Sequence, residues 1–402
     1  MTPLAHQPWL TRPATRAVIA ALEAAGGEGC VRFVGGCVRN SLMGQPVDDI
    51  DLATRLEPEA AMKALTAAGL KVVPTGLVHG TVTAVSGRAP YEITTLRRDV
   101  STDGRNATVA FTDDWSEDAR RRDFRLNALY ADGSGTVFDP TGHGVEDARA
   151  GRIVFVGDPE TRIREDYLRI LRFFRFFAWY GQGEPDAEGL AACAALADGM
   201  VRLSAERVSR ELLKLLRAPD PRPAVSAMAS SGVLSQVLPD AASLEMFERM
   251  VALSPDPVLR LSSLLPADPQ TVEAAARALR LSNPDRLRLV AAAFGEVDLD
   301  MTPPAARAHL YRLGRETFRD RVQRAAAQTD RAGDATPWLD LADAWPIPRL
   351  PVGGRRVAAA GLPAGPDTGR VLAAFEEGWI ADDFPTEGHT ERLARVIASL
   401  NA

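Results

Sequence analysis

The spacing of hydrophobic positions changes part-way along the chain, and this change predicts two kinds of architecture. Up to about residue 150, short runs that alternate apolar and polar residues are typical of strands, and segments with helical spacing lie between them. The expected strands are residues 31–34, 48–53, 70–74, 80–86 and 90–96. The expected helices are residues 1–27, a segment ending near Met43, and residues 57–68. The chain therefore begins with helices and a small mixed sheet.

From about residue 158 onward, helical spacing is almost continuous. Proline-rich runs at 219–223, 264–269 and 346–351 interrupt it, and proline ends helices because it lacks a backbone N–H. The predicted fold class is therefore α+β, with the sheet confined to the first part of the chain. The polar, glycine-bearing segment 99–113 is expected to be a mobile loop.

Length and cysteine content indicate how many domains the chain has and in which compartment it lies. A chain of 402 residues exceeds one ordinary core, so we expect two or more domains. Its three cysteines include no CxxC pair, which favours a reducing compartment and argues against zinc and disulfides. We find no signal-peptide pattern at the start and no apolar run long enough to span a bilayer. We therefore expect a cytoplasmic location and no membrane partner.

The charge of the chain is uneven. A net charge of −6 argues against a protein that binds nucleic acid over its whole surface. Residues 149–176, however, hold seven arginines against four acids, which makes a local basic stripe. Because such stripes matter more than totals for contacts with phosphates, this segment remains a candidate for nucleotide or RNA contact.

Two glycines follow the expected strand 31–34 and open a helix. At such a turn, Gly35 and Gly36 let a ligand approach the backbone, and the free N–H groups of the first helical turn face an anion. Arg39, in or near that first turn, could add a side-chain contact to phosphate. Taken alone, the glycine pair is also compatible with an ordinary turn.

Two aspartates lie in the next expected strand. Side chains alternate between the faces of a strand, so Asp49 and Asp51 should point the same way while Ile50 points into the core. A pair of carboxylates held together is costly unless a cation or a proton neutralises it. Oxygen ligands suit Mg²⁺, which binds through one or two carboxylates plus substrate phosphates. A solvated turn would also accommodate these acids, but the nearby anion cradle favours a phosphoryl site.

A third acid and a polar segment could complete this site. Glu92, in the expected strand 90–96, could approach the aspartate pair across the sheet, as two-metal phosphoryl transfer requires, or could be an ordinary exposed residue. In residues 121–130, Asp123 and Asn127 lie four apart and would share a helix face, with Arg122 beside them to reach phosphate or ribose. A local helix salt-bridge network is the alternative for that segment.

The segment 161–176 (TRIREDYLRILRFFRF) is expected to be one helix that carries a basic face. Asp166 and Arg169 are three residues apart and should be neighbours on it, with Arg172 and Arg175 continuing the face toward phosphate or base. A carboxylate accepts hydrogen bonds whereas a guanidinium only donates them. An amphipathic helix with solvated arginines is the structural alternative.

An acceptor beside a donor fits only some base edges. Cytosine offers an N4 amine beside N3 and adenine an N6 amine beside N1, whereas uracil and guanine reverse that order. Each unpaired buried polar group costs about 1–3 kcal/mol, so a site of this kind rejects the reversed edges. Asp166 and Arg169 could therefore act as a protein template for C and A.

These motifs together resemble the class II tRNA nucleotidyltransferases, the CCA-adding enzymes. The segments that carry the resemblance are VGGCVRN, DIDLAT, TGLVHGTVT, YEITTLRRD, TDGRNA, RRDFRLNALY, DPTGHGVEDA and EDYLRILRFFRF. The resemblance implies a catalytic nucleotidyltransferase head at 1–150, a helical neck for nucleotide selection at 151–216, and a helical body and tail that bind tRNA at 217–402. It also implies CTP and ATP as substrates, Mg²⁺ as cofactor and no DNA partner.

The resemblance assigns roles by position. Asp49 and Asp51 would be the metal ligands and Glu92 the third catalytic acid. Triphosphate and sugar would be held by Gly36, Arg39 and Arg122. The nucleotide-selecting set would be Asp166, Arg169, Arg172 and Arg175.

Two residues depart from the family pattern, and several related functions stay open. Asn40 stands where the family usually has Asp, and Arg125 where Thr is usual, but neither touches the expected metal pair. The same motifs would suit an enzyme that adds only CC or only A, or a bacterial poly(A) polymerase. A non-catalytic RNA-binding protein is disfavoured by the intact Asp49/Asp51 pair. The sequence does not determine the oligomeric state.

Overall fold

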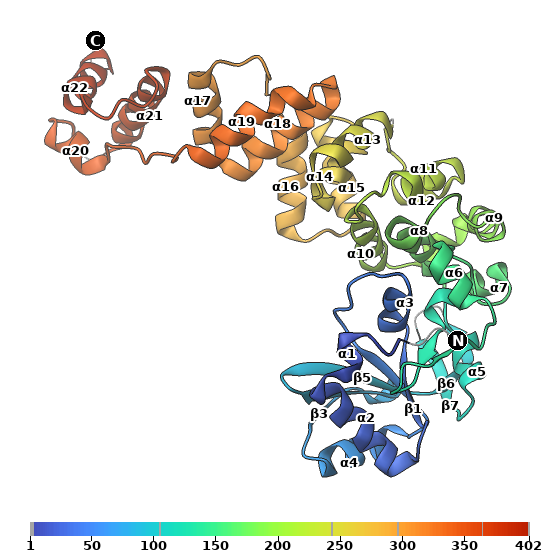
Figure 1. Ribbon diagram of the computed structural model, residues 1–402. Coiled ribbons are helices and arrows are strands. Elements are labelled where there is room, and N and C mark those ends of the chain that lie inside the picture. Colours follow the sequence, from blue (N-terminus) through green and yellow to red (C-terminus); the bar gives the residue numbers. More distant parts are fainter. Residues whose placement is uncertain (1–3, 104–105, 243, 296, 364, 401–402) are drawn as a thin grey trace. The chain divides into compact units, whose positions relative to one another are not determined.

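The computed structural model describes residues 4–103, 106–242, 244–295, 297–363 and 365–400 (Figure 1). The chain divides into two compact units, residues 1–239 and 240–402. The first unit holds both sheets, and the second consists of helices and their connections wherever it is described. The predicted α+β class is confirmed. The predicted boundaries at 150 and 216 fall inside the first unit and stay a prediction.

A mixed sheet of seven strands organises the first unit, in the order β3-β4-β5-β2-β1-β8-β9. Strands β2 and β5 pair in parallel, and the other neighbours pair antiparallel. The strands are β1 (Val31–Val34), β2 (Asp51–Thr54), β3 (Lys71–Gly76), β4 (Thr81–Ser86), β5 (Ala89–Thr95), β8 (Tyr130–Ala131) and β9 (Val137–Phe138). All five strands expected from alternation are present, although β2 begins three residues later than expected.

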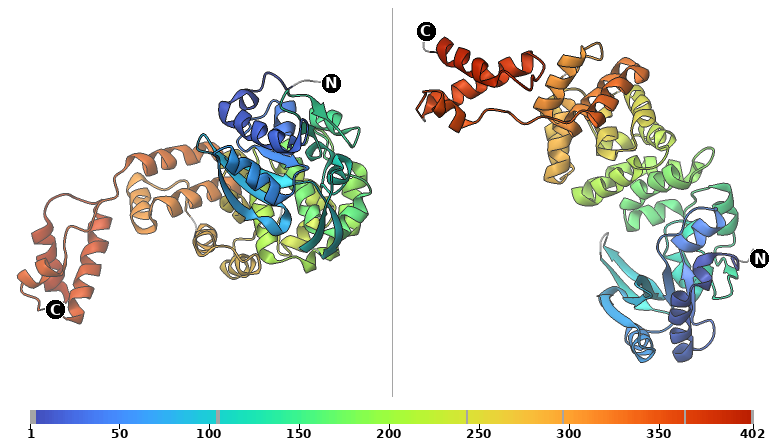
Figure 2. Two further views of the ribbon diagram at one scale, coloured as in Figure 1. Left: turned by 90° about the horizontal axis from the view of Figure 1, so that it is seen from below. Right: turned by 60° about the vertical axis from the view of Figure 1, so that its left-hand side comes forward.

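Helices flank this sheet and bury its apolar side chains. Two of them, α2 (Pro13–Gly26) and α4 (Pro58–Ala67), contact each other and β4, so they cover the same face (Figure 2). Val18 and Leu22 of α2 and Phe33 and Leu52 of the central strands are fully buried between these layers. The other helices here are α1 (Pro8–Thr11), α3 (Gly36–Leu42), α5 (Trp115–Arg120) and α6 (Gly144–Ala150), with 3₁₀ turns at Leu77–His79 and Arg125–Asn127.

Two segments of the first unit differ from expectation. The expected mobile loop 99–113 largely belongs to a two-stranded antiparallel sheet of β6 (Arg97–Asp103) and β7 (Asn106–Phe111). The expected helix at 121–130 is absent, because Arg125–Asn127 forms a single 3₁₀ turn that leads into β8. Backbone pairing supplies the reason in the first case, since β6 and β7 satisfy each other's N–H and C=O groups.

The first unit ends in helices, which are α7 (Pro159–Glu165), α8 (Leu168–Tyr180), α9 (Ala187–Ala195), α10 (Ala205–Leu216), α11 (Arg222–Ser230) and α12 (Val233–Val237), with a 3₁₀ turn at Ala197–Arg202. Helix α8 packs against both α10 and α11. Its phenylalanines at 173, 174, 176 and 177 are buried, as the apolar stripe of 161–176 predicted.

The second unit contains α13 (Leu244–Leu253), α14 (Pro257–Ser263), α15 (Pro269–Ala278), α16 (Asn283–Ala293), α17 (Pro303–Leu313), α18 (Arg315–Thr329), α19 (Ala332–Ala344), α20 (Gly354–Ala359), α21 (Pro366–Ala381) and α22 (His389–Leu400). Local sequence explains where two of these helices begin, since Asp256 and Asp268 each cap a helix whose first residue is proline. The three proline-rich runs lie at helix junctions, as predicted. No described helix has the length and apolar content needed to cross a membrane.

Candidate active site

A polar cavity of about 460 Å³ brings together residues from the sheet, the 121–127 segment and the helices that follow. Seven of the ten predicted site residues line it: Gly36, Arg39, Asp51, Arg122, Asp166, Arg169 and Arg172. Gly35, Arg121, Asp123, Asn127, Leu168, Phe176 and Arg207 complete its wall. The cavity therefore joins the expected phosphate cradle to the expected base-reading residues.

The acidic side of the cavity is centred on Asp51. It begins β2 and pairs in register with Glu92 on the parallel neighbour β5, so both side chains leave the sheet at the same level. Partial burial, together with the negative charges of Glu92 and Asp49, raises the pKa of Asp51 to about 6, although Arg122 opposes the shift. Glu92 therefore approaches Asp51 across the sheet, as predicted, but it is an exposed residue, and its role as a third acid stays a prediction.

Asp49 lies outside the strand, contrary to the expectation for residues 48–53. Strand β2 begins at Asp51, and Asp49 is an exposed residue before it, with buried Ile50 between them. Its charge still acts on Asp51. In the described part of the chain, no three His, Cys, Asp or Glu side chains gather closely enough to hold a metal ion alone. Asp51 and Asp49 could hold a divalent cation if substrate phosphate and water supplied the remaining ligands.

Arg39 is more occupied by protein contacts than a free phosphate ligand would be. Its Nε and Nη2 donate to Oδ1 of Asn40 at 3.1 and 2.8 Å, its Nη1 donates to Oδ1 of Asn127 at 2.5 Å, and Nη2 also donates to the Tyr180 hydroxyl at 2.8 Å. Burial lowers the pKa of Arg39, with Tyr180 and Asp123 opposing the shift. These direct partners are all neutral, so the cavity keeps the charge of this guanidinium beside Gly36.

A second arginine faces the same space from the 121–127 segment. Arg122 is bound to Asp118 at 2.9 Å and to the Tyr130 hydroxyl at 3.2 Å. Burial disfavours a charged Asp118, but Arg122, Arg121 and the Tyr130 hydroxyl together hold its pKa well below the usual range. Nη1 of Arg122 lies 3.9 Å from the place where a Cβ on Gly35 would stand. Arg122 is thus fixed beside the glycine turn, where the resemblance places triphosphate and sugar.

Asp123 and Asn127 meet as predicted, although a turn rather than a helix brings them together. Asn127 Nδ2 donates to Asp123 Oδ1 at 3.0 Å, and Arg172 Nε donates to Asp123 Oδ2 at 2.9 Å. Burial opposes ionisation of Asp123, yet Arg172 and Asn127 keep its pKa well below the usual range. Arg172 of α8 is thereby held against the 121–127 segment.

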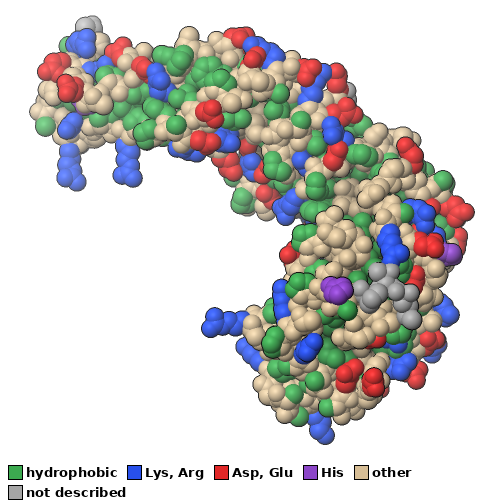
Figure 3. Space-filling model, viewed as in Figure 1, with side chains coloured by type: hydrophobic (Ala, Val, Ile, Leu, Met, Phe, Trp, Pro, Cys, Tyr) green, Lys and Arg blue, Asp and Glu red, His purple; other side chains and the backbone are tan. Residues whose placement is uncertain are grey.

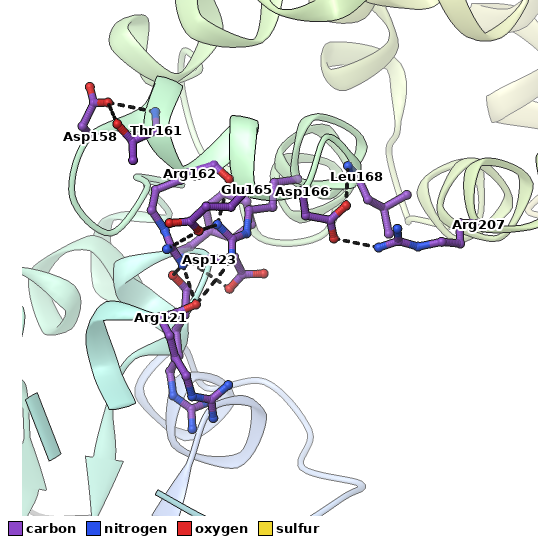
Figure 4. A network of polar contacts seen from close by, with 12 residues as sticks. Arg121, Asp123, Asp158, Thr161, Arg162, Glu165, Asp166, Leu168 and Arg207 are labelled. Carbon is purple, nitrogen blue, oxygen red and sulfur yellow. Dashed lines mark hydrogen bonds and ion pairs between the residues drawn. The ribbon is translucent and has the colours of Figure 1, made fainter. Parts of the chain in front are cut away.

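The expected single helix at 161–176 is broken at Asp166, and this break presents its carboxylate. Helix α7 ends at Glu165, Asp166 is extended (φ −154°, ψ 107°), and α8 begins at Leu168. Asp166 Oδ1 accepts the backbone N–H of Leu168 at 3.1 Å, and Oδ2 accepts Nη2 of Arg207 at 2.7 Å (Figure 4). A short side chain that accepts a backbone N–H near a helix start explains the break.

Of the two other arginines in the predicted nucleotide-selecting set, Arg169 lines the cavity and Arg175 does not. Arg169 lines the cavity, where Nη1 forms an ion pair with Glu165 and Nη2 donates to the Arg121 carbonyl at 3.4 Å. Arg175 instead binds buried Glu211 of α10 at 2.5 Å and does not belong to the residues that line the cavity. A role in nucleotide binding stays a prediction for both.

Sequence analysis missed the positioning partners of the cavity. Arg207 belongs to ERVSRELLKLL, a segment with no chemical pattern that points to Asp166, some 40 residues earlier. Arg121 was visible only as the first residue of the Arg-Arg-Asp run. A second cavity of about 600 Å³ lies in the second unit, but Arg321 and Arg324 there already donate to the carbonyls of Ala291 and Leu265.

Two family models match the chain. The model described as the Poly A polymerase head domain matches residues 31–154, and the one described as a probable RNA and SrmB-binding site of polymerase A matches residues 184–244. The first match covers the sheet and the 121–127 segment, and the second covers α9 to α12.

Individual relatives extend the similarity over most of the chain. Human mitochondrial CCA tRNA nucleotidyltransferase 1 is 33% identical over 373 residues, which cover 89% of this chain and 84% of the human protein. The CCA-adding enzyme of Geobacillus stearothermophilus is 38% identical over 223 residues, 55% of this chain and 53% of that protein. The crystal structure of Bacillus stearothermophilus CCA-adding enzyme in complex with CTP superposes with a TM-score of 0.78 and 27% identity, covering 97% of this chain and 100% of that one. By this similarity and its site motifs, the chain belongs to the class II CCA-adding tRNA nucleotidyltransferases.

Proposed function

We propose that the protein adds CCA to the 3′ end of tRNA without a nucleic-acid template, using CTP and ATP and releasing pyrophosphate. One observation carries the proposal: Asp166 and Arg169 line the same cavity as Asp51, Gly36 and Arg122. A base reader and a triphosphate site thus share one space. Relatives named CCA tRNA nucleotidyltransferase, and a relative solved with CTP, support the same activity.

Asp166 and Arg169 retain the capacity to read a base. Each carboxylate oxygen of Asp166 accepts one protein hydrogen bond and has a second lone pair to offer. Nη1 of Arg169 donates to Glu165 and to the Arg162 carbonyl, and Nη2 donates to the Arg121 carbonyl. These contacts fix the plane of the guanidinium and use three of its five N–H groups, which leaves the others to donate to a base. An amine beside a ring acceptor, as in cytosine and adenine, would meet an acceptor beside a donor. The reversed edges of uracil and guanine would leave polar groups unpaired.

The remaining residues orient the reacting groups. Arg39 and Arg122 would bind the triphosphate beside Gly36, which places the α-phosphorus near Asp51. The 3′ hydroxyl of the RNA loses its proton to water and its oxygen forms a bond to that phosphorus, the bond between the phosphorus and the oxygen that bridges to the β-phosphate breaks, and pyrophosphate leaves. Positioning and charge stabilisation are the protein's main contributions to reactions of this class.

The carboxylates fit a divalent cation, and we propose Mg²⁺. Asp51 would hold it with Asp49, and Glu92 would lie within reach as the third acid. The raised pKa of Asp51 supports this, because burial and the negative charges of Glu92 and Asp49 disfavour its ionised form, and a bound cation would offset both. When bound, the ion would lower the pKa of the attacking hydroxyl and offset charge on the phosphates.

Incorporation assays on three tRNA substrates test the proposal. Purified protein is given labelled CTP or ATP with one tRNA that ends at the discriminator base, a second that ends in C, and a third that ends in CC. We expect two C additions and then one A, with growth ending there. Addition of C alone, or of A only to the CC end, would indicate a partial enzyme. Long A tails would indicate a poly(A) polymerase, and RNA binding without incorporation would indicate a non-catalytic protein.

The location is a separate proposal. The three cysteines are free and buried, which supports a reducing compartment such as the cytoplasm. Fractionation of cells that express the tagged chain would test it.

A further inference from the structure

One face of α8 extends from the wall of the cavity to the end of the helix. Arg172, Phe176 and Tyr180 follow one another at intervals of four residues and therefore share this face. Arg172 and Phe176 line the cavity, whereas Tyr180, the half-buried last residue of α8, does not. The rings of Phe176 and Tyr180 pack together with their centroids 5.6 Å apart. Tyr180 thus contacts the cavity wall without being part of it.

Arg39 lies against this face and connects it to the glycine turn. Its guanidinium carbon lies 4.0 Å from the centroid of the Tyr180 ring and 5.3 Å from that of the Phe176 ring. The Tyr180 hydroxyl also accepts Nη2 of Arg39 at 2.8 Å. The face of the ring attracts the cation, and the hydroxyl fixes the direction of one N–H group. Tyr180 therefore determines both where the guanidinium lies and how its plane is oriented.

A closed ring of side-chain hydrogen bonds begins and ends on α8. Its members, in order, are Arg172, Asp123, Asn127, Arg39 and Tyr180. The two ends are eight residues apart on one helix, which is close to two helical turns. Because α8 carries both ends, it holds Arg39 through the 121–127 segment on one side and directly through Tyr180 on the other. The helix that contributes Arg169 and Arg172 to the cavity thus also fixes the guanidinium beside Gly36.

Arg39 also differs from the other arginines of the cavity wall in its charge balance. Carboxylates pair with those arginines, which are Arg121, Arg122, Arg169, Arg172 and Arg207. No ion pair of Arg39 is found among the residues that the structure describes, and its side-chain partners are Asn40, Asn127 and Tyr180. A carboxylate would hold an arginine more strongly but would offset its charge. Neutral acceptors fix the orientation of Arg39 and leave its charge for an anion.

We propose that Tyr180 is a positioning residue of the nucleotide site, which holds Arg39 in the orientation that binds the triphosphate. The inference rests on the proposed function, in which Arg39 binds the triphosphate beside Gly36. A guanidinium that is already oriented loses less conformational freedom when the nucleotide binds. Tyr180 acts through Arg39 on the phosphates and not on the base. A tyrosine that only packs the end of α8 would instead affect every part of the nucleotide equally.

The test is a double-mutant cycle with a matched control. Tyr180→Phe removes the hydroxyl and keeps the ring, and Arg39→Gln removes the cation. The affinities of the wild type, both single variants and the double variant for CTP and for CMP are measured by isothermal titration calorimetry with Mg²⁺ and without tRNA. The control is Tyr91→Phe, which removes a buried hydroxyl that shares a hydrogen bond with the Thr15 hydroxyl at 3.0 Å. The melting temperature of each protein is measured in parallel.

We expect Tyr180→Phe to weaken CTP binding roughly 3–10-fold, because one hydrogen bond that orients the cation is lost. CMP binding should weaken less than about twofold, because CMP lacks the outer two phosphates, which a cation beside the glycine turn would bind. In the Arg39→Gln background, Tyr180→Phe should change CTP affinity by less than about twofold, since the residue through which it acts is gone. The ratio of kcat/KM for CTP and UTP should stay at the wild-type value, and Tyr91→Phe should keep the wild-type affinity for CTP.

Three outcomes would overturn the inference. These are an unchanged CTP affinity in Tyr180→Phe, an equal loss for CTP and CMP, and a loss that persists in full in the Arg39→Gln background. Failure of the proposed function is distinguishable, because the wild-type protein would then incorporate neither C nor A into tRNA. Failure of this inference alone would leave wild-type incorporation intact.

Discussion

Two carboxylates, partly buried Asp51 in the first unit and buried Asp320 in the second, differ in whether an arginine is paired with them. Burial raises the pKa of Asp320 in the second unit, and the charges of Asp256 and Glu316 add to the rise, whereas Arg288, bound at 2.8 Å, offsets part of it. Burial also raises the pKa of Asp51 in the first unit, and there Glu92 and Asp49 raise it further. An arginine is paired directly with Asp320, whereas no ion pair to Asp51 is found among the described residues and Arg122 lowers its pKa only in part. A raised pKa is therefore better evidence of a ligand site where no cation of the protein is paired with the carboxylate.

The ion pairs of the two units also differ in what they hold in place. In the second unit, Arg307 with Asp383 and Arg331 with Asp300 join segments far apart in sequence, and these four residues do not line the polar cavity of the first unit. In the first unit, pairs such as Arg172 with Asp123 fix side chains at the wall of the cavity. Acidic and basic side chains are interspersed over the face shown in Figure 3, and that face carries no single large patch of one sign.

The largest expected effect comes from Asp51→Asn. It should lower nucleotide transfer at least about 10³-fold, because several kcal/mol of charge stabilisation at the reacting phosphate depend on this corner. The melting temperature of the ion-free protein should not fall, since the repulsion from Glu92 and Asp49 disappears. Single-turnover kinetics and a thermal scan measure both. Retention of near-normal transfer would remove Asp51 from the mechanism.

Asp166→Ala should act on selectivity more than on rate. Removal of the acceptor should reduce discrimination of CTP against UTP by roughly 10–100-fold, because the penalty for the reversed base edge is lost. The ratio of kcat/KM for the two nucleotides is the measurement. Asp158→Ala, which also removes an aspartate that accepts a backbone N–H near a helix start, is the control and should leave the ratio unchanged. An unaltered ratio in Asp166→Ala would contradict the template model.

Asp320→Asn should lower stability and leave nucleotide transfer unchanged, whereas Asp51→Asn should lower transfer and leave stability unchanged. Loss of the charge that faces Arg288 should lower the free energy of unfolding by roughly 1–3 kcal/mol, because a hydrogen-bonded charge pair is broken in a partly buried setting. Nucleotide transfer at a temperature where the variant is folded should stay at the wild-type level. Denaturant unfolding followed by circular dichroism gives the free energy. A loss of transfer in the folded variant would mean that the second unit takes part in the chemistry.

The smallest expected effect is a pH dependence of Mg²⁺ binding. The pKa of Asp51 is about 6 in the folded state and about 3.9 in an unfolded chain, so the folded state binds more protons between these values and stability falls as pH rises through that window. The ion needs the ionised form, so its affinity should fall about tenfold per pH unit below 6. The melting shift caused by Mg²⁺ should therefore be larger at pH 7.5 than at pH 5. Asp51→Asn should abolish the difference, and an equal shift at both pH values would contradict the site.

Local patterns were sufficient to predict much of the framework. Strand 31–34 and the glycine turn after it were found because alternation and glycine act over a few residues. The pairing of β6 with β7 was missed because the polar residues of segment 99–113 were given more weight than its capacity to form strands.

The site was predicted less completely because its contacts are long-range. Spacing alone made Asp166 and Arg169 neighbours on one helix, whereas a backbone hydrogen bond breaks the helix between Glu165 and Leu168. Arg207 reaches Asp166 only after α10 packs on α8, and no periodicity encodes that contact. Candidate residues could thus be named from motifs, but their partners required the fold.

The carboxylate of Asp166 serves both the proposed nucleotide selection and the start of α8, and this links nucleotide specificity to stability. While it faces the cavity, it also accepts the first N–H of α8, a bond of a kind worth about 0.5–2 kcal/mol at helix starts. A substitution that removes the carboxylate of Asp166 would therefore destabilise the first turn of α8 and also change which nucleotides the enzyme selects. A variant that adds a different sequence to the 3′ end because Asp166 is replaced would therefore also have a lower melting temperature. This coupling between stability and nucleotide selection helps to keep the added sequence constant.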